Sequence, residues 1–395
     1  MKVYLIKASA PGDFKDYKKM TGGPSQNIHS AAACTPAGID IEMTDETIDM
    51  KVNFKSDADI VAIFFSTPDA VHGYKVASEF KKLGKTVVMG GLHASFMTLE
   101  ALKYADSVMI GEIEGIWEEL IEDFSKGELK KLYQRKTPVD LATLKPYPTH
   151  IIPLSKYNRT WSVVVGRGCK YACAYCTVTP FFKKLRFRPI DNIVEEVKNC
   201  GAKYVELHAD NLIADREYAL ELLRKLAPLK KTFFGEATVD IAEDKEMLEA
   251  MKAAGFKYIL VGLETPDQEA LNKVGKGFLK VEKLEKYIKI IKSYGIEIDA
   301  SILFGFDEHD KTIFDRSIKF AKKIKVQGYR GVVVTPYPGT RLYAQWDKEG
   351  RIITKDWSKY DGTQVPYKPK QMTTQELKDG VYKFNAATYF GKSIF

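Results

Sequence analysis

Three cysteines within eight residues constrain this chain more than any other feature of its sequence. Cys169, Cys173 and Cys176 follow the spacing Cys-x3-Cys-x2-Cys, directly after an apolar run at 161–165 that is typical of a strand. Three thiolates on one loop can hold three irons of a [4Fe–4S] cluster and leave the fourth iron open, because thiolate is the preferred ligand of iron–sulfur centres. A zinc site would need a fourth ligand at close spacing, and the next cysteine is Cys200. The sequence therefore predicts a cluster held by these three thiolates.

The remaining composition indicates a globular intracellular protein. The chain has 395 residues, of which 45% are hydrophobic, which is enough for two or three packed domains. We expect no membrane span, because no apolar run approaches the roughly 18 to 20 residues that a span needs. Five cysteines, three of which lie close together, do not fit the disulfide framework of a secreted protein. These features favour a cytoplasmic location.

The charge is distributed unevenly along the chain. Residues 1–134 contain 15 Lys, no Arg and 20 acidic residues, a net charge of −5, so the other 261 residues carry +13 to reach the total of +8. Much of this positive charge is lysine on periodic segments such as 279–294, which is typical of a solvated helix face. The two halves are therefore different modules, and we do not expect nucleic acid as a partner.

The first half predicts a Rossmann-like parallel sheet. Short β-branched runs at 3–6, 39–43, 60–65, 86–89 and 107–110 are separated by helical periodicity, for example at 70–83. Ligands of such sheets lie across the carboxyl ends of the strands. The candidate ligand-binding residues of domain 1–134 are therefore those in the loops after the third, fourth and fifth strands: Ser66, Thr67, Gly90, Gly91, His93, Gly111, Glu112 and Glu114.

The second half predicts a partial barrel. Residues 135–160 contain four prolines among polar residues and are expected to form a linker. Strand patterns at 204–208, 232–237, 258–263, 296–304 and 331–335 then follow the one at 161–165 and alternate with amphipathic helices. Six strands with helices between them form a (β/α)6 partial TIM barrel over residues 161–340, and residues 341–395 would cap it.

Polar residues at the ends of the barrel strands are further site candidates. Asp210, Glu236 and Glu264 each follow or end an apolar strand, and Ser301 and Gly305 lie in the segment 301–308. Functional loops of such barrels gather at the carboxyl ends of the strands, which favours a ligand-binding role. Acidic residues at these places can equally cap the next helix, and this alternative stays open.

These motifs together resemble the cobalamin-dependent radical S-adenosylmethionine (SAM) enzymes. The cysteine loop, with Tyr175 just before its last cysteine, resembles the loop that binds the cluster in that superfamily, and residues 3–124 resemble its cobalamin-binding domain. The segment 301–308 is similar to the Gly-x-Ile-x-Gly-x-x-Glu motif beside the SAM adenine, with Ser301 and Leu303 as departures. The Asp-x-His-x-x-Gly pattern of domains that ligate cobalt with histidine does not occur in the chain.

The resemblance implies three cofactors: a [4Fe–4S] cluster, SAM and cobalamin. SAM would chelate the open iron and contact residues on the barrel, and cobalamin would lie on the eight loop residues of the first domain without a histidine ligand. The implied SAM-binding residues are Tyr175, Asp210, Glu236, Glu264, Ser301 and Gly305.

The implied function is C-methylation. A 5′-deoxyadenosyl radical takes hydrogen from an unactivated sp3 carbon, and methylcobalamin then supplies the methyl group. The substrate would be a small molecule, a lipid or a peptide side chain such as Gln or Arg of methyl-coenzyme M reductase, and a ferredoxin or flavodoxin would donate electrons. No catalytic residue beyond those that bind cofactors is predicted.

Three alternatives stay open at this point. The same cofactors also serve enzymes that cyclise or rearrange their substrates. An RNA-modifying methylthiotransferase would need a second three-cysteine cluster, and only Cys34 and Cys200 are left over. A cobalamin-binding protein without catalysis would leave the cysteine loop unexplained.

Overall fold

The computed structural model describes residues 1–11 and 23–388 and divides the chain into two compact units. The first unit comprises the described parts of residues 1–161 together with the short segments 181–183 and 356–361. The second comprises residues 162–180 and 184–355 and the described part of 362–395. Within the described ranges, no helix is both long and apolar enough to cross a membrane.

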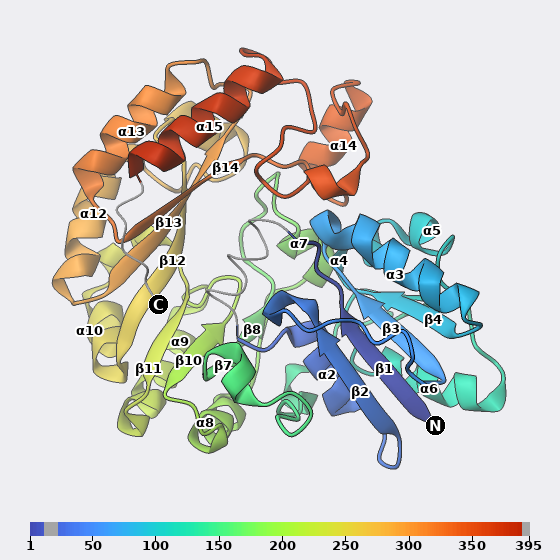
Figure 1. Cartoon of the computed structure of the whole chain (residues 1–395). Helices are drawn as coiled ribbons and strands as arrows, with labels where there is room; N and C mark the ends of the chain where they lie inside the picture. Colours follow the sequence, from blue (N-terminus) through green and yellow to red (C-terminus); the bar gives the residue numbers. More distant parts are fainter. Residues whose placement is uncertain (12–22, 389–395) are drawn as a thin grey trace. The chain divides into compact units, whose positions relative to one another are not determined.

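The first unit is built on a parallel sheet of six strands in the order β2-β1-β3-β4-β5-β6 (Figure 1). All neighbouring strands run parallel. The strands are β1 Lys2–Lys7, β2 Asp40–Asp45, β3 Ile60–Phe64, β4 Thr86–Gly90, β5 Ser107–Ile110 and β6 Leu132–Gln134, and the helices are α2 Gln26–Cys34, α3 Ala70–Lys82, α4 Leu92–Phe96, α5 Thr98–Ala101 and α6 Ile116–Lys126. The predicted Rossmann-like architecture is confirmed.

Helices cover both faces of this sheet, which explains its apolar strands. Side chains such as Val3 and Phe64 pack with Ile28 of α2 and Trp117 of α6 on one face. Tyr4 faces the other side and meets Phe80 of α3 edge-on, with ring centroids 5.9 Å apart. A strand that is covered on both faces needs a continuous apolar run rather than alternation, and β3 is accordingly buried at all five positions.

The sheet has one strand more than the sequence predicts. β6 is only three residues long, and only its central residue, Tyr133, is buried. It pairs with β5 at the edge of the sheet. So short a strand has no periodicity that could identify it in the sequence.

The segment 135–160, predicted as a linker, packs on the first unit. It contains the 3₁₀ turns Leu141–Thr143 and Leu154–Tyr157. Ile152 and Tyr157 belong to the core around Trp117. The Tyr157 hydroxyl also lies 3.0 Å from Nε2 of the buried His29. The segment is therefore an irregular part of this unit.

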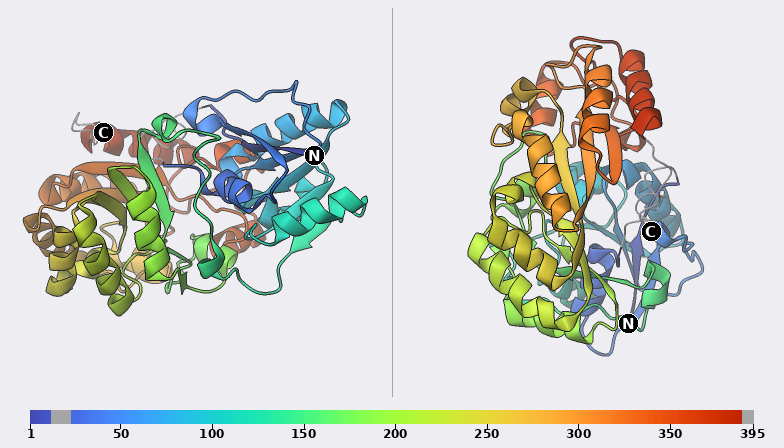
Figure 2. Two further views of the ribbon diagram at one scale, coloured as in Figure 1. Left: turned by 90° about the horizontal axis from the view of Figure 1, so that it is seen from below. Right: turned by 90° about the vertical axis from the view of Figure 1, so that its left-hand side faces the viewer.

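The second unit is the predicted partial barrel, with strand order β14-β13-β12-β11-β10-β7. The pairs from β10 to β14 are parallel. Figure 2 shows the helices of residues 190–324 outside the strands. The strands are β7 Thr160–Val164, β10 Tyr204–His208, β11 Thr232–Glu236, β12 Phe256–Glu264, β13 Glu297–Phe304 and β14 Gly328–Val333; the helices are α7 Val178–Phe182, α8 Ile190–Asn199, α9 Arg216–Leu226, α10 Lys245–Ala254, α11 Gln268–Lys273, α12 Val281–Ser293, α13 Ile313–Ile324, α14 Arg341–Lys348 and α15 Thr374–Thr388.

Strand β13 shows how the barrel acquires a polar interior. Its burial alternates: Ile298, Ala300 and Ile302 are buried, while Asp299 and Ser301 between them are partly accessible. Successive side chains of a strand point to opposite faces, so the apolar set packs outward on helices and the polar set faces inward. The barrel therefore presents charged and hydroxyl groups to its interior.

The open edge of the barrel sheet is covered by α15. The Asn385 side chain accepts a hydrogen bond from the Gly331 N–H at 2.8 Å and donates one to the Gly331 carbonyl at 2.9 Å. Phe384 packs on Phe304, with ring centroids 5.0 Å apart. An edge strand with unpaired backbone groups invites association, and here a helix of the same chain satisfies it.

Candidate functional site

The cysteine loop is held in place from both sides. It follows β7 and a short antiparallel pair, β8 Gly166–Arg167 with β9 Arg186–Phe187. The Ala174 N–H donates to the Val274 carbonyl, and the Ala174 carbonyl accepts from the Leu342 N–H, both at 2.9 Å. At the start of the loop, Gly168 has φ +92°, and a Cβ there would lie 2.4 Å from the Lys184 carbonyl oxygen. A glycine is therefore required at this position.

The three cysteines of this loop are free thiols with partly accessible side chains. Burial raises the pKa of Cys176 to about 12 and raises the pKa values of Cys169 and Cys173 above their usual range. Thiols in such surroundings become thiolates only when a metal displaces the proton. No three described His, Cys, Asp or Glu side chains converge as ligands of one metal ion would. In a cluster each thiolate binds a different iron, so the donor set fits a [4Fe–4S] group.

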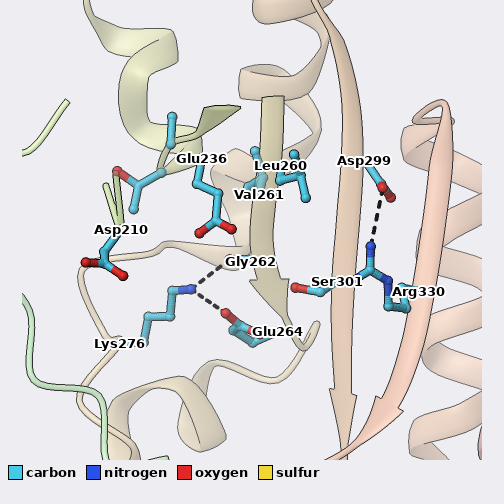
Figure 3. A pocket seen from close by; sticks show the side chains of 12 residues that line it. Asp210, Glu236, Leu260, Val261, Gly262, Glu264, Lys276, Asp299, Ser301 and Arg330 are labelled. Carbon is cyan, nitrogen blue, oxygen red and sulfur yellow. Dashed lines mark hydrogen bonds and ion pairs between the residues drawn. The ribbon is translucent and has the colours of Figure 1, made fainter. Parts of the chain in front are cut away.

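A polar cavity of about 260 Å³ lies inside the barrel (Figure 3). Its walls come from β10 to β14 and the loops that follow them. Four of the six predicted SAM-binding residues line it, while Tyr175 and Gly305 do not. The lining residues are Asp210, Glu236, Ala237, Thr238, Leu260, Val261, Gly262, Glu264, Lys276, Asp299, Ser301 and Arg330.

Glu264 is directed into this cavity by an irregular backbone. The pairing of β12 with β13 shifts register between Gly262 and Glu264, and Glu264 has φ +62°, which is unusual for a residue other than glycine. Bulges and left-handed residues of this kind re-aim side chains and gather at functional sites. The Glu264 side chain is buried and accepts a hydrogen bond from Lys276 Nζ at 2.5 Å.

Lys276 links Glu264 to the cysteine loop. Its Nζ also donates to the Gly262 carbonyl at 2.9 Å. Burial lowers the pKa of Lys276, but the charge of Glu264 and the nearby Cys173 outweigh this and raise it above its usual value. Burial and the negative charge of Glu264 hold the pKa of Tyr175 well above its usual range. This corner of the cavity thus offers a permanent positive charge beside the predicted cluster.

Asp210 connects the second barrel strand to the same loop. Its carboxylate accepts a hydrogen bond of 2.7 Å from the N–H of Gly168. Burial raises the pKa of Asp210, and the positive charge of His208 and the Gly168 hydrogen bond oppose this. Asp210 therefore helps to position the loop as well as lining the cavity.

Gly305 lies beside a buried histidine that the sequence does not single out. It has φ +99°, and a Cβ there would lie 2.1 Å from the hydroxyl of Tyr367. Its N–H donates to His309 Nδ1 at 3.3 Å, and His309 Nε2 lies 3.0 Å from the Thr265 hydroxyl. Burial lowers the pKa of His309 to about 4, so the ring is neutral. His309 thus ties the loops after β12 and β13 together.

Further charges lie on strands β10, β11, β13 and β14 of the barrel. His208 and Glu206 form an ion pair of 3.6 Å, and Arg330 and Asp299 form one of 3.5 Å. Burial lowers the pKa of His208, but the interaction with Glu206 and the other acids raises it to about 8. The barrel walls around the accessible Glu236 carboxylate limit its hydration and raise its pKa to about 7, with His208 opposing and two neighbouring acids adding to the shift.

In the first unit, the predicted cobalamin-binding loops lie at one edge of the sheet. Ser66 and Thr67 follow β3, Gly90 and Gly91 end and follow β4, and Gly111 follows β5, and these three strands are neighbours. Gly91 has φ +94°, and a Cβ there would lie 2.9 Å from the Phe65 carbonyl oxygen. The fold therefore brings these five residues to adjacent loops, and their role as corrin contacts remains a prediction.

His93, also predicted to contact cobalamin, is fully buried. Its Nδ1 lies 3.2 Å from the Thr67 hydroxyl and its Nε2 lies 3.5 Å from Glu100. Trp357 covers its ring, with centroids 5.0 Å apart, and donates from Nε1 to Glu100 at 2.7 Å. His93 therefore joins the loops after β3 and β4 rather than presenting an open ring.

The other predicted contacts of the first unit are partly or wholly engaged with the protein. Glu112 accepts a hydrogen bond of 3.3 Å from the N–H of Val139, and Glu114 is buried. His72 lies 2.7 Å from Glu46. His29, His72 and His93 thus each have a protein partner, which agrees with the absence of the Asp-x-His-x-x-Gly pattern.

Replacing Trp357 by Ala is expected to lower corrin binding without lowering the iron content. The substitution removes the cover of His93, and loss of a buried tryptophan costs about 3–5 kcal/mol. Unfolding by denaturant and the ratio of bound cobalamin to iron measure both effects. The control is Trp357→Phe, which keeps an aromatic cover and should retain more cobalamin than the Ala variant. Full cobalamin content in Trp357→Ala would contradict the predicted role of these loops.

The site residues that the sequence does not predict have no recognisable motif around them. Asp299 is marked only by its alternation with apolar neighbours in β13, and Arg330 only by its place on the next strand. Lys276 stands between two glycines, a pattern that could have drawn attention to it. His309 and Trp357 gain their roles through contacts with distant residues, which no short pattern reveals.

Comparison with known proteins agrees with this geometry. Residues 163–321 match the Radical SAM superfamily. The bacteriochlorophyllide d C-8(2)-methyltransferase of Chlorobaculum tepidum is 31% identical over 386 residues, which cover 91% of this chain and 84% of that protein. The anaerobic magnesium-protoporphyrin IX monomethyl ester cyclase of Cereibacter sphaeroides is 24% identical over 379 residues, which cover 85% of this chain and 61% of that protein.

Two solved structures share the fold. The radical SAM methyltransferase TsrM from Kitasatospora setae, with cobalamin and a [4Fe–4S] cluster bound, has a TM-score of 0.72 at 16% identity and covers 88% of this chain and 75% of its own. The cobalamin-dependent SAM radical enzyme OxsB has a TM-score of 0.67 at 14% identity and covers 96% of this chain and 65% of its own. These two structures show that the chain has the fold of cobalamin-dependent radical SAM enzymes. Taken with the cysteine loop, the Radical SAM match and the relative of 31% identity show that the chain belongs to the radical SAM methyltransferases.

Proposed function

We propose that this protein methylates an unactivated sp3 carbon. The observation that carries the proposal is the combination, in one chain, of a three-cysteine loop hydrogen-bonded to Asp210 of a polar barrel cavity and a separate unit with a six-stranded parallel sheet. When bound, cluster and SAM together supply a radical that removes a hydrogen atom, and cobalamin supplies the methyl group. The chain itself supplies binding, orientation and exclusion of water.

We assign each barrel residue a role from its position. Cys169, Cys173 and Cys176 would hold the cluster, and the nearby Lys276 would offer its charge to the carboxylate of SAM. Asp210 and Glu264 lie close enough to influence the cysteine thiols and would meet the amino group and ribose of SAM. Ser301, Gly305 and Tyr175 complete the proposed SAM site, with the backbone at Gly305 on the adenine side.

The first unit would hold the corrin on the loops at the carboxyl edge of its sheet. Ser66, Thr67, Gly90, Gly91 and Gly111 would approach the ring or its nucleotide tail. Glu112 and Glu114 would contribute through the same loop, and His93 would position Thr67. We expect a cobalamin spectrum without histidine ligation, because the histidines of this region already have protein partners.

The substrate class is the finer part of this proposal. The names of the relatives point to tetrapyrroles, and a peptide side chain, such as Gln or Arg of methyl-coenzyme M reductase, is the candidate from the sequence. An external one-electron donor of the ferredoxin or flavodoxin type would reduce the cluster. Both substrate classes can be offered to the same anaerobic preparation.

Product analysis tests methyl transfer directly. Anaerobic turnover with a reductant, methylcobalamin and candidate substrates should yield S-adenosylhomocysteine and 5′-deoxyadenosine in a ratio of about one to one, because one SAM supplies the methyl group and another the radical. Deuterium on the target carbon should appear in 5′-deoxyadenosine. Mass spectrometry of both SAM products and of the substrate is the measurement.

Cyclisation or rearrangement is the second candidate, favoured by the relatedness to the anaerobic cyclase. It keeps the same cofactor sites and drops the transfer of a methyl group. Over many turnovers, 5′-deoxyadenosine without S-adenosylhomocysteine, together with a product of unchanged carbon count, would select this candidate over methylation.

A further inference from the structure

Both cations of the barrel cavity are already paired. Lys276 contacts Glu264 at 2.5 Å, and Arg330 contacts Asp299 at 3.5 Å. The cavity is lined by four carboxylates and these two cations, so two carboxylates, those of Asp210 and Glu236, remain without a cationic side chain of their own in the lining. The lining is therefore suited to a group that brings positive charge with it.

Glu236 is the less committed of these two acids. Asp210 accepts the hydrogen bond from Gly168, whereas the carboxylate of Glu236 has no hydrogen bond or ion pair with any residue in the described parts of the chain. Glu236 is the last residue of β11 and projects into the cavity, where its side chain is accessible (Figure 3). The other three carboxylates of the lining each have a protein partner, so Glu236 is the one whose oxygens can accept from a bound ligand without breaking an existing contact.

Glu236 also differs from the other acidic residues predicted to bind SAM in its relation to the cysteine loop. The thiols are influenced by Asp210, Glu264 and Lys276. The charged groups that influence Glu236 are His208, Asp210, Glu206 and Arg330. Asp210 is common to both sets, but Glu236 is not among the main influences on any of the three thiols. This separates Glu236 from the other predicted SAM contacts.

We propose that the barrel cavity binds a positively charged nitrogen group of the substrate, an ammonium or a guanidinium, and that Glu236 accepts its hydrogen bonds and determines this specificity. The inference rests on the proposed function, because it assigns the substrate side of the same site. It reassigns Glu236 from SAM to substrate. A carboxylate hydrogen-bonded to such a cation gives a charge-assisted contact, which is among the strongest polar contacts in a protein.

The affinity for such a group should rise with pH. Only the ionised form of Glu236 pairs with a cation, and its pKa of about 7 means that ionisation increases between pH 6 and 8. His208, with a pKa of about 8, loses its competing charge over part of the same range. The pKa of Glu206 is lowered and that of Lys276 is raised, so these two groups keep their charges there. In a Glu236→Gln variant, only the part due to His208 should remain.

Binding of small probes to the anaerobic holoenzyme, loaded with cluster, SAM and cobalamin, tests this inference. The probes are butylammonium, butylguanidinium and the neutral isostere butylurea, and ligand-observed NMR gives their dissociation constants. The wild-type protein should bind at least one cation about tenfold or more tightly than butylurea, and the better cation names the group. Glu236→Gln should lose about tenfold or more for that cation and leave butylurea unchanged.

The controls separate this inference from folding and from the proposed reaction. Glu249→Gln removes one acidic charge from the exposed face of α10 and should bind all probes like the wild type. The iron content and denaturant unfolding of Glu236→Gln should also match the wild type. Equal binding of the cations to wild type and Glu236→Gln, or weaker SAM binding with unchanged cation binding, would overturn the proposal. Cation binding in an enzyme that forms no S-adenosylhomocysteine would refute methyl transfer but leave the proposal standing.

Discussion

Replacing Cys169, Cys173 and Cys176 together by Ala should reduce the iron and sulfide of anaerobically purified protein from about four each per chain to near zero. The three thiols are the only cysteines on the loop that is clamped at Ala174 between residues 274 and 342. Without an attached cluster there is no open iron for SAM to chelate, so formation of 5′-deoxyadenosine should fall below detection. Iron and sulfide assays and product analysis measure the two losses.

The two other cysteines provide the matched controls. Cys34 is buried in the first unit and burial raises its pKa to about 12, and Cys200 follows α8 at a distance from the loop in sequence. Cys34→Ala and Cys200→Ala should keep the full iron content. If either lost it, or if the triple variant kept it, the ligand assignment would be wrong.

Replacing Lys276 by Met should have the second large effect, on both stability and SAM binding. The variant leaves the buried carboxylate of Glu264 without its partner, and breaking a buried ion pair in this way costs about 3–5 kcal/mol. It also removes the positive charge beside the cysteine loop, which we expect to weaken SAM binding at least tenfold. Denaturant unfolding and equilibrium binding of SAM under anaerobic conditions are the measurements.

A double variant separates the two effects. Lys276→Met combined with Glu264→Gln removes both charges and should recover a large part of the lost stability, because no charge is left buried alone. SAM binding should stay weak, since the cation is still missing and Glu264, itself a proposed SAM contact, is changed as well. Recovery of SAM binding along with stability would show that Lys276 acts on the fold alone.

The fold could be predicted from the sequence because its signals are local. The β-branched runs that become β1, β3, β4 and β5 are buried on both faces, and they end at the glycines and hydroxyl residues that form the loops. The barrel strands carry the same signal with alternation added, as in β13. The strand β6, with a single buried residue, and the two-residue strands β8 and β9 are too short for periodicity to detect.

The candidate site was predictable only in part. Asp210, Glu236, Glu264 and Ser301 stand at strand ends or on an alternating strand, and all four line the cavity. The positive left-handed φ of Glu264 and its pairing with Lys276, twelve residues further on, depend on how two loops meet in space. The position of a residue at a strand end predicts whether its side chain reaches the cavity. The partner of each charged side chain depends on tertiary contacts, which the sequence does not show.

Residues 356–361 belong to the first unit although they follow the barrel strands in the sequence, and this affects how the first unit folds during synthesis. Trp357 packs on His93 and Glu100, more than 250 positions earlier in the chain. During synthesis, the sheet of the first unit can form long before this segment leaves the ribosome, yet His93 stays uncovered until residues 356–361 have been translated. A product that ends before residue 356 would therefore leave His93 and Glu100 permanently without their contacts to Trp357, and quality-control proteases could recognise it by this exposed site.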